Sequence, residues 1–405
     1  MNSVAIVGAS LAGLSAARAL RAQGFDGRLT LVGAEPHRPY DRPPLSKEFL
    51  AGEMTEADLA LEAEGEDLDA EWLLGVPATG LTPLDRGGAR VTLGDGTAVE
   101  ADGVVIATGA AARTLPAGLS GELSAKPPRE PSGGLAGVHT LRTLDDARAL
   151  RADLAAGRRL VVVGAGFIGA EVASTARALG LDVTIVEVAP APFARALGDE
   201  MGTALGTLHE DNGVRLVCGA AVRALTGDDR VDGVVLEDGR RLPADVVLAG
   251  IGARPAVEWL AGSGVKVADG VLCDAGGGTG VPGVVAVGDC AAWFDPALGR
   301  HLRVEHWTGA ARRPDIAVRT LLSGGTAVPD GLAPPYIWSD QYGLRVQFAG
   351  HALPGDMVTV EEGDAGGRGF LAVYRREGQA VAVLGVDRVR QFTRWRRSLQ
   401  PAGAR

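Results

Sequence analysis

Two glycine-rich stretches of the chain have the spacing of dinucleotide-binding turns. The stronger is GAGFIG, residues 164–169, which follows an apolar run and precedes a stretch with helical periodicity. In such a turn Gly164 allows a tight bend, Gly166 lets the backbone approach a pyrophosphate, and Gly169 lets the helix pack on the strand. The N–H groups at the start of the helix then face the phosphates. This segment predicts a dinucleotide site.

An acidic residue after the next predicted strand indicates which dinucleotide binds there. Glu187 lies eighteen residues beyond Gly169. Its carboxylate would accept hydrogen bonds from the adenosine ribose hydroxyls and would repel a 2′-phosphate. We therefore expect NAD rather than NADP at this second turn.

The first glycine-rich stretch is GASLAG, residues 8–13, which also lies between a predicted strand and a predicted helix. Ser10 stands where the fingerprint has its second glycine, and an acid, Glu35, comes just past the following strand. Two such sites in one chain indicate two different dinucleotides. The simplest combination is a flavin nucleotide that is reduced by a nicotinamide nucleotide.

Three further segments fit a chain that passes close to a cofactor. VVIATGA (104–110) and VVLAGIGARP (246–255) are apolar strands that end in small residues. VPGVVAVGDCAA (281–292) places Asp289 after a strand and before a predicted helix. There the Asp289 carboxylate would hold ribityl hydroxyls while the helix N-terminus faces the pyrophosphate. A simple helix cap is an equally good interpretation of Asp289.

The elements that must position these residues are buried strands alternating with helices, which indicates parallel sheets. After about residue 328, short alternating runs broken by Gly indicate an antiparallel sheet, and VDRVRQFTRWRRSL then indicates a basic helix. The predicted fold is α/β, with two Rossmann-like domains for FAD and NAD and a C-terminal α+β domain. A Pro/Gly/Ser-rich stretch at 116–134 is predicted to be a loop or linker that joins the domains.

Composition excludes several classes of function. The 405 residues carry a net charge of −10, which argues against a nucleic-acid partner. The only cysteines, Cys218, Cys273 and Cys290, are far apart, so we expect neither a redox-active dithiol nor a metal site. Thiols without a framework fit a reducing cytoplasm. No signal peptide and no run of 18 apolar residues appears, so we expect a cytoplasmic protein without a membrane span.

The order of motifs resembles one family. GxSxAG, PYxRPPLSK, ATG, LRTLDDA, GAGFIGAE, the Gly-Asp-Cys turn, ExW and WSDQY together are similar to the FAD-dependent, NADH-specific ferredoxin reductases of the glutathione-reductase-like superfamily. These enzymes serve haem-thiolate monooxygenases and aromatic-ring dioxygenases. The resemblance runs from about residue 3 to about residue 395. It implies an FAD-binding domain in two segments, 1–113 and 244–327, an inserted NAD-binding domain, 114–243, and a C-terminal α+β domain, 328–405. It implies electron transfer from NADH through FAD to a [2Fe–2S] ferredoxin, which is a transient protein partner.

The resemblance also implies site residues. Lys47 and Glu171 would be electrostatic supports near flavin N5 and the nicotinamide carboxamide. The implied FAD contacts are Gly8, Ser10, Ala12, Gly13, Glu35, Arg42, Lys47, Thr79, Ala107, Thr108, Gly109, Arg142, Gly288, Asp289 and Trp307. The implied NAD contacts are Gly164, Gly166, Phe167, Ile168, Gly169, Glu171, Glu187 and Gly252.

Two departures from the family pattern lead to further expectations. The chain reads Ala34-Glu35 where the family often has Asp-Glu. Pro314 stands in the helix predicted after ExW and should interrupt or restart it.

Arginines near the C-terminus would steer an acidic ferredoxin, or they would form an ordinary solvated helix face. These are Arg388, Arg390, Arg394, Arg396 and Arg397.

Other acceptors and another class of function stay open from the residues alone. An NADH oxidase, a quinone reductase or a rubredoxin reductase would keep the same two dinucleotides, although NADH oxidases of this superfamily need a Cys near PPLSK and none precedes Cys218. A sensor resembling apoptosis-inducing factor would bind flavin and NADH without turnover.

Overall fold

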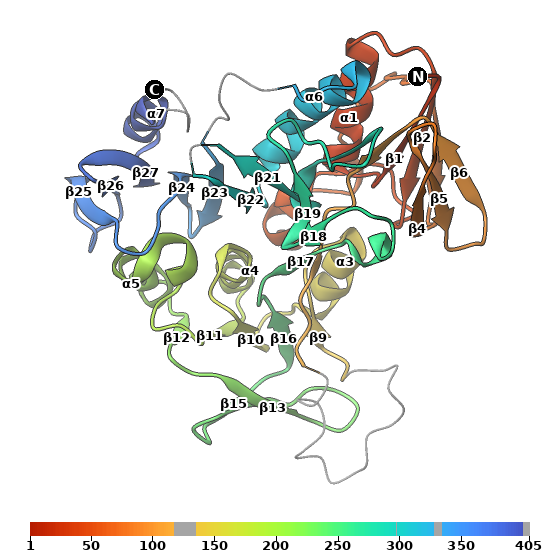
Figure 1. The fold of residues 1–405 in the computed structure, drawn as a ribbon. Coiled ribbons are helices and arrows are strands. Elements are labelled where there is room, and N and C mark those ends of the chain that lie inside the picture. The colour runs from red at the N-terminus through yellow and green to blue at the C-terminus, as the bar shows by residue number, and fades with distance from the viewer. Residues whose placement is uncertain (117–134, 297, 328–333, 400–405) are drawn as a thin grey trace.

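The computed structural model of the chain describes residues 1–116, 135–296, 298–327 and 334–399. Two parallel sheets and one antiparallel sheet organise these residues (Figure 1).

The first parallel sheet combines strands that are far apart in the sequence. Its order is β20-β7-β1-β2-β3. The strands are β1 (Ser3–Val7), β2 (Arg28–Gly33), β3 (Ala70–Leu74), β7 (Gly103–Ile106) and β20 (Val284–Ala286). Helices α1 (Leu11–Ala22) and α6 (Trp307–Ser323) lie together against it and share its apolar core. These elements belong to the first unit, residues 1–112 and 253–327.

The second parallel sheet has the order β12-β11-β10-β16-β9. Its strands are β9 (Val138–His139), β10 (Arg159–Val163), β11 (Asp182–Val186), β12 (Arg215–Val217) and β16 (Val246–Ala249). Its helices are α3 (Leu144–Asp153), α4 (Phe167–Ala178) and α5 (Ala194–Asp211). These elements form the second unit, described over residues 135–252.

The predicted boundary at residue 243 does not fit this sheet. β16 was assigned to the second FAD-binding segment, but it pairs with β10, with Leu160 opposite Val246. The chain returns to the first unit only at β17 (Ala253–Pro255), which pairs antiparallel with the outgoing strand β8 (Ala110–Ala112). We therefore propose a boundary after residue 252. The predicted linker at 116–134 lies almost wholly outside the described residues.

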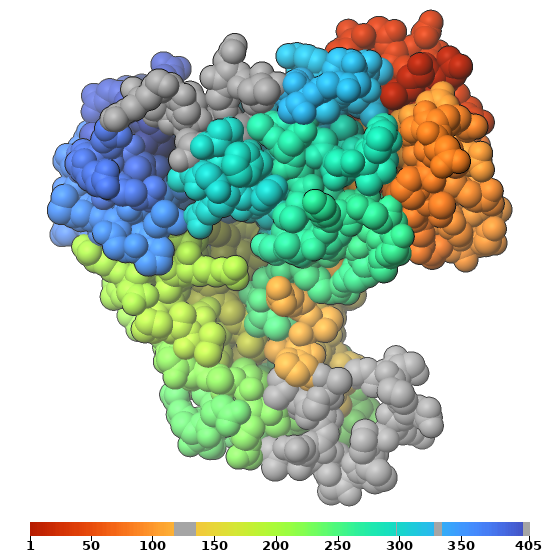
Figure 2. Space-filling view, in the orientation of Figure 1, coloured from red at the N-terminus to blue at the C-terminus, as the bar shows by residue number. Residues whose placement is uncertain are grey.

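The C-terminal unit, residues 334–399, is an antiparallel sheet in the order β23-β24-β27-β26-β25. The strands are β23 (Tyr336–Gln341), β24 (Leu344–Gly350), β25 (Met357–Gly363), β26 (Phe370–Arg376) and β27 (Gln379–Val386). One face packs on α5, where Leu197 and Met201 meet Phe348 in a shared core. The predicted basic helix is α7 (Val389–Ser398), and Phe392 packs it on the other face. Figure 2 shows this blue unit against the yellow-green second unit.

Smaller elements complete the units. The first unit adds η1 (Pro43–Ser46), α2 (Glu48–Ala51), η2 (Ala57–Leu59), β4 (Ala78–Pro83), β5 (Ala89–Leu93), β6 (Ala98–Ala101), η4 (Glu258–Leu260), β18 (Val267–Ala268), β19 (Gly270–Cys273), η5 (Gly288–Cys290), β21 (Ala291–Asp295) and β22 (Arg300–Arg303). The second unit adds β13 (Val222–Thr226), β14 (Gly233–Leu236) and β15 (Arg241–Pro243). The predicted fold class, two Rossmann-like domains and a C-terminal α+β domain, is confirmed.

The expectation for Pro314 is wrong. Helix α6 runs continuously from Trp307 to Ser323 with Pro314 inside it and buried. Proline removes one backbone donor from a helix interior, but its fixed φ suits a helix. Packing of the apolar face of α6 against α1 and the first sheet outweighs that loss.

Candidate functional site

The main cavity has a volume of about 790 Å³ and lies where the three units meet. Its walls come from the turns that follow β1, β2 and β7, from the start of α4, from the segment before α6 and from β23. It brings together many of the predicted site residues. They are Gly8, Ser10, Ala12, Glu35, Arg42, Lys47, Ala107, Thr108, Gly109, Arg142, Phe167, Ile168, Glu171, Asp289 and Trp307.

The turn after β1 is shaped by close backbone contacts. Gly8 has a φ of +122°, and a Cβ on it would lie 2.0 Å from the carbonyl oxygen of Ala107. A Cβ on Gly13 would lie 1.8 Å from the carbonyl oxygen of Gly8. Ser10 is the N-cap of α1, yet its side chain makes no capping hydrogen bond and the first turn has no acidic residue. The N–H groups there are therefore available to an anion in the cavity.

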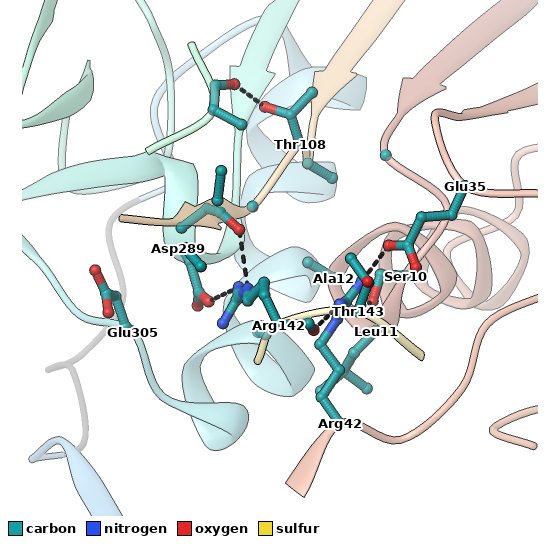
Figure 3. Close-up of a pocket in the computed structure, with 18 of the residues that line it drawn as sticks. Ser10, Leu11, Ala12, Glu35, Arg42, Thr108, Arg142, Thr143, Asp289 and Glu305 are labelled. Carbon is teal, nitrogen blue, oxygen red and sulfur yellow. Dashed lines mark hydrogen bonds and ion pairs between the residues drawn. The ribbon is translucent and has the colours of Figure 1, made fainter. Parts of the chain in front are cut away.

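A band of charged side chains crosses the cavity (Figure 3). Arg142 donates from Nη2 to Asp289 Oδ2 at 2.6 Å and from Nε to the carbonyl oxygen of Ala110 at 2.9 Å. Arg42 donates from Nη2 to Glu35 Oε1 at 2.6 Å and also donates to the carbonyl oxygen of Arg142. The band links both segments of the first unit to the second unit.

Asp289 lies in the cavity wall as predicted, but its backbone setting differs from the prediction. It sits in the short 3₁₀ turn η5, and β21 follows instead of a helix. The predicted helix N-terminus and the alternative of a helix cap are therefore both wrong. Gly288 has a φ of +73°, which makes the turn possible, and Ala12 of α1 lies 2.9 Å from the position of its missing Cβ.

Lys47 and Glu171 form a buried ion pair. Lys47 Nζ lies 3.0 Å from Glu171 Oε2, and their side chains are 11% and 4% exposed. Two hydroxyl groups also donate to this carboxylate: Ser46 donates to Oε2, and Ser339 donates to Oε1 at 2.8 Å. The residues come from η1 and its end, α4 and β23, so one carboxylate joins all three units.

The second cavity, of about 150 Å³, lies at the glycine turn of the second unit. It is lined by Gly166, Phe167 and Glu187, among others. A Cβ on Gly164 would lie 2.4 Å from the carbonyl oxygen of Gly250, whereas a Cβ on Gly166 would meet no atom within 4 Å. The backbone at Gly166 is thus open to a ligand. Glu187 accepts from the N–H groups of Ala165 at 2.6 Å and Ala189 at 2.9 Å.

Some predicted contacts line neither cavity. Gly13, Gly164, Gly169 and Gly288 shape the turns, and Gly252, with a φ of +99°, begins the return at β17. Thr79 is exposed and donates to the carbonyl oxygen of Thr92 at 3.3 Å. Its neighbour Ala78 lines the main cavity instead, because successive side chains of a strand point to opposite faces.

The cavity also contains residues that the sequence reasoning did not single out. Tyr40 donates its hydroxyl proton to Glu35 and accepts from the N–H of Leu144 at 2.9 Å, and burial raises its pKa. His306 lines the wall with a buried Nδ1 that has no protein partner, and burial lowers its pKa to about 4. Trp338 also lines it. Tyr40, His306 and Trp338 lie in the motifs PYDRPP, ExW and WSDQY, respectively. The motifs themselves were therefore the sequence signal that could have identified these three residues.

The cysteines supply no reactive group at this site. Cys273 and Cys290 are buried, and burial raises the pKa of both thiols. Across the described ranges, no group of three or more His, Cys, Asp or Glu side chains is placed to hold a metal ion. Within the same ranges, no helix is both long and apolar enough to cross a membrane.

Comparison with known proteins places this geometry among reductases. The chain is 40% identical over 392 residues to the ferredoxin reductase component of the chlorobenzene dioxygenase of Cupriavidus sp. (strain PS12), covering 96% of this chain and 90% of that protein. It is 34% identical to putidaredoxin reductase of Pseudomonas putida, covering 96% and 90% of the two chains.

Solved structures and family patterns agree with these relatives. The crystal structure of the covalent putidaredoxin reductase–putidaredoxin complex matches with a TM-score of 0.88 at 32% identity, over 98% of this chain and 93% of that chain. Residues 336–404 match the reductase C-terminal family. Residues 2–313 match the description pyridine nucleotide-disulphide oxidoreductase, and the chain belongs to that family.

Proposed function

We propose that the protein is a ferredoxin–NAD⁺ reductase that holds FAD in the main cavity and receives NADH at the turn of the second unit. The observation that carries this proposal is the meeting of the two dinucleotide turns at one cavity, with Phe167 of the NAD turn lining both cavities. Bound FAD would supply the chemistry: it accepts a hydride from NADH and passes the two electrons singly to a one-electron acceptor.

The residues of the main cavity fit a flavin dinucleotide. The N-terminus of α1 and the Gly8 turn offer N–H groups to a pyrophosphate. Asp289 offers a carboxylate to ribityl hydroxyls beside Arg142, and His306 Nδ1 is a buried hydrogen-bonding atom that lacks a protein partner. Glu35 already accepts from Arg42 and Tyr40, but a carboxylate has about four acceptor positions, so a ribose hydroxyl can share it.

The residues near the meeting point of the two sites would orient the bound dinucleotides and stabilise charge that develops on them. Lys47 presents a cation in the wall of the main cavity and is held there by Glu171. In a site that excludes water, a fixed cation stabilises negative charge that develops on a bound group. Glu187 at the second turn favours NADH over NADPH because a 2′-phosphate would meet its carboxylate.

The electron acceptor that we propose is a [2Fe–2S] ferredoxin of an oxygenase system; the names of the relatives include a ferredoxin and a dioxygenase. Helix α7 lies beside the cavity: the Arg396 guanidinium stacks 4.0 Å from the ring centroid of Tyr336, which lines it. Arg394 pairs with Glu362 at 3.1 Å, while Arg390 and Arg397 are exposed. These last two are the arginines that we propose to steer an acidic partner. A cytoplasmic location fits the free thiols.

The test is a stopped-flow and steady-state experiment on the purified yellow protein. NADH should bleach the flavin absorbance, and a [2Fe–2S] ferredoxin from a ring-dioxygenase system should raise the rate of cytochrome c reduction at least tenfold. Rubredoxin and a quinone serve as matched acceptors. A rate that ferredoxin leaves unchanged, or a reduced flavin that stays bound to NAD⁺ without turnover, would overturn the proposal in favour of another acceptor or a sensor.

A further inference from the structure

The carboxylate of Glu171 is held by groups from outside its own helix. Oε2 meets Lys47 Nζ at 3.0 Å and accepts from Ser46, and Oε1 accepts from Ser339 at 2.8 Å. Ser46, Glu171 and Ser339 are 2%, 3% and 0% exposed. Little water reaches the carboxylate, so protein groups must replace the hydrogen bonds that water would make.

The direction of the Ser339 hydroxyl is set by its neighbour on the strand. Gln341 donates from Nε2 to Ser339 Oγ at 3.0 Å, and Ser339 donates onward to Glu171. Residues two apart on a strand share a face, so both side chains of β23 point toward α4. Because Ser339 Oγ accepts a hydrogen bond from Gln341, the hydroxyl proton of Ser339 is the one donated to the Glu171 carboxylate.

The register of β23 against the second unit is fixed at the end of the strand. The backbone N–H of Tyr342 donates to Ser174 Oγ at 2.7 Å, and the Tyr342 hydroxyl lies 2.7 Å from His209 Nδ1. Thr175 donates to the carbonyl oxygen of Ser46 at 2.8 Å, which ties α4 to the loop that carries Lys47. Ser339 therefore approaches Glu171 from a rigid frame.

Lys47 has no comparable frame of its own. Its ammonium ends a four-carbon stem with several rotatable bonds, and it donates a hydrogen bond to Glu171. The carboxylate of Asp41 also attracts this ammonium, but the hydrogen-bonded position of the cation in the cavity wall follows the carboxylate of Glu171, which Ser339 helps to hold.

We propose that Ser339 is a positioning residue: it fixes Glu171 and, through it, holds the Lys47 ammonium against the main cavity. The C-terminal unit thus completes a site whose other walls belong to the first and second units. The inference rests on the proposed function only in that Lys47 faces the flavin.

The test compares Ser339→Ala in two backgrounds, the natural chain and Lys47→Met. The readouts are the anaerobic rate of flavin reduction by NADH and the midpoint potential of the bound flavin. In the natural background we expect a five- to tenfold slower reduction and a shifted potential. In the Lys47→Met background we expect less than a twofold further change, because the cation through which Ser339 acts is gone.

Two further variants separate positioning from general stability. Ser263→Ala removes another buried hydroxyl, which donates to the carbonyl oxygen of Leu260 at 2.6 Å, and it should leave both readouts unchanged. Ser339→Thr keeps a donor and should recover most of the rate. Equal slowing by Ser339→Ala in both backgrounds, or a potential that it leaves unchanged, would overturn the proposal.

A failure of the proposed function would look different. The natural chain would then bind no FAD, or its flavin would not be reduced by NADH. The coupling of Ser339 to Lys47 would still be read from thermal unfolding of the same four combinations of variants. Additive changes in melting temperature would overturn the positioning role.

Discussion

Replacing Lys47 by Met tests how strongly the ion pair joins the units. Methionine keeps much of the length of the side chain and removes the charge, so Glu171, whose side chain is 4% exposed, loses its cation. Removing one partner of a buried pair costs about 3–5 kcal/mol. Because Ser46 and Ser339 still donate to Glu171, we expect the lower end, about 3 kcal/mol, in the free energy of unfolding.

The assay is thermal unfolding at fixed FAD concentration, since bound cofactor itself raises the melting temperature. At about 2 °C per kcal/mol, Lys47→Met should lower that temperature by roughly 6 °C. Glu171→Gln leaves the Lys47 ammonium without its carboxylate partner and should lower the free energy of unfolding by a similar amount. The double variant leaves a neutral amide between two hydroxyls, so its loss should be about 1 kcal/mol, far below the sum of the single losses. Losses that add up in the double variant would refute this account of the pair.

Three other outcomes are expected. Glu187→Ala should reduce the preference for NADH over NADPH at least tenfold in kcat/KM, and an unchanged preference would count against the ribose contact. Arg390→Glu should raise the KM for ferredoxin severalfold at low salt but little at 0.5 M salt, because salt screens the attraction. The control Arg223→Glu changes an exposed arginine of β13 and should leave the KM for ferredoxin unchanged. An equal rise in KM for the two variants would contradict steering by α7. Arg18 donates to Glu66 at 2.6 Å and lowers the pKa of Glu66 from its ordinary 4.5 to about 2. The pair therefore stabilises the fold above pH 4.5 and loses that effect as the pH falls toward 2, so the melting curves of Glu66→Gln and the natural chain should converge there.

Local patterns predicted the parallel sheets because each strand, turn and helix is contiguous in the sequence. The glycine turns at Gly8 and Gly164 were found in this way, and so was the carboxylate at Glu187. Register and long-range pairing carry no such local signal. β16 reads equally well as a strand of either unit, and only its pairing with Leu160 assigns it to the second.

The errors at the site have physical causes. The local cost of proline in a helix predicts an interruption at Pro314, but the tertiary packing of α6 outweighs that cost. Asp289 was expected before a helix because a strand and a small-residue turn preceded it, yet the next residues pair with β19 and β22. The partners of Glu171 come from segments more than 120 residues away on either side, so no spacing rule could have brought Ser339 to it.

The pairing of β8 with β17 also bears on how the chain assembles. Ala112 and Ala253 are opposite one another, so the second unit begins and ends at nearly the same point. Before that unit folds, joining β20 to β7 requires closure of a very long loop, whose entropic cost grows with the logarithm of its length. Once the second unit has folded, the antiparallel pairing of β8 with β17 holds the two segments of the first unit next to each other. The insertion therefore favours an order of assembly in which the NADH-binding unit folds first and brings together the two segments of the first unit.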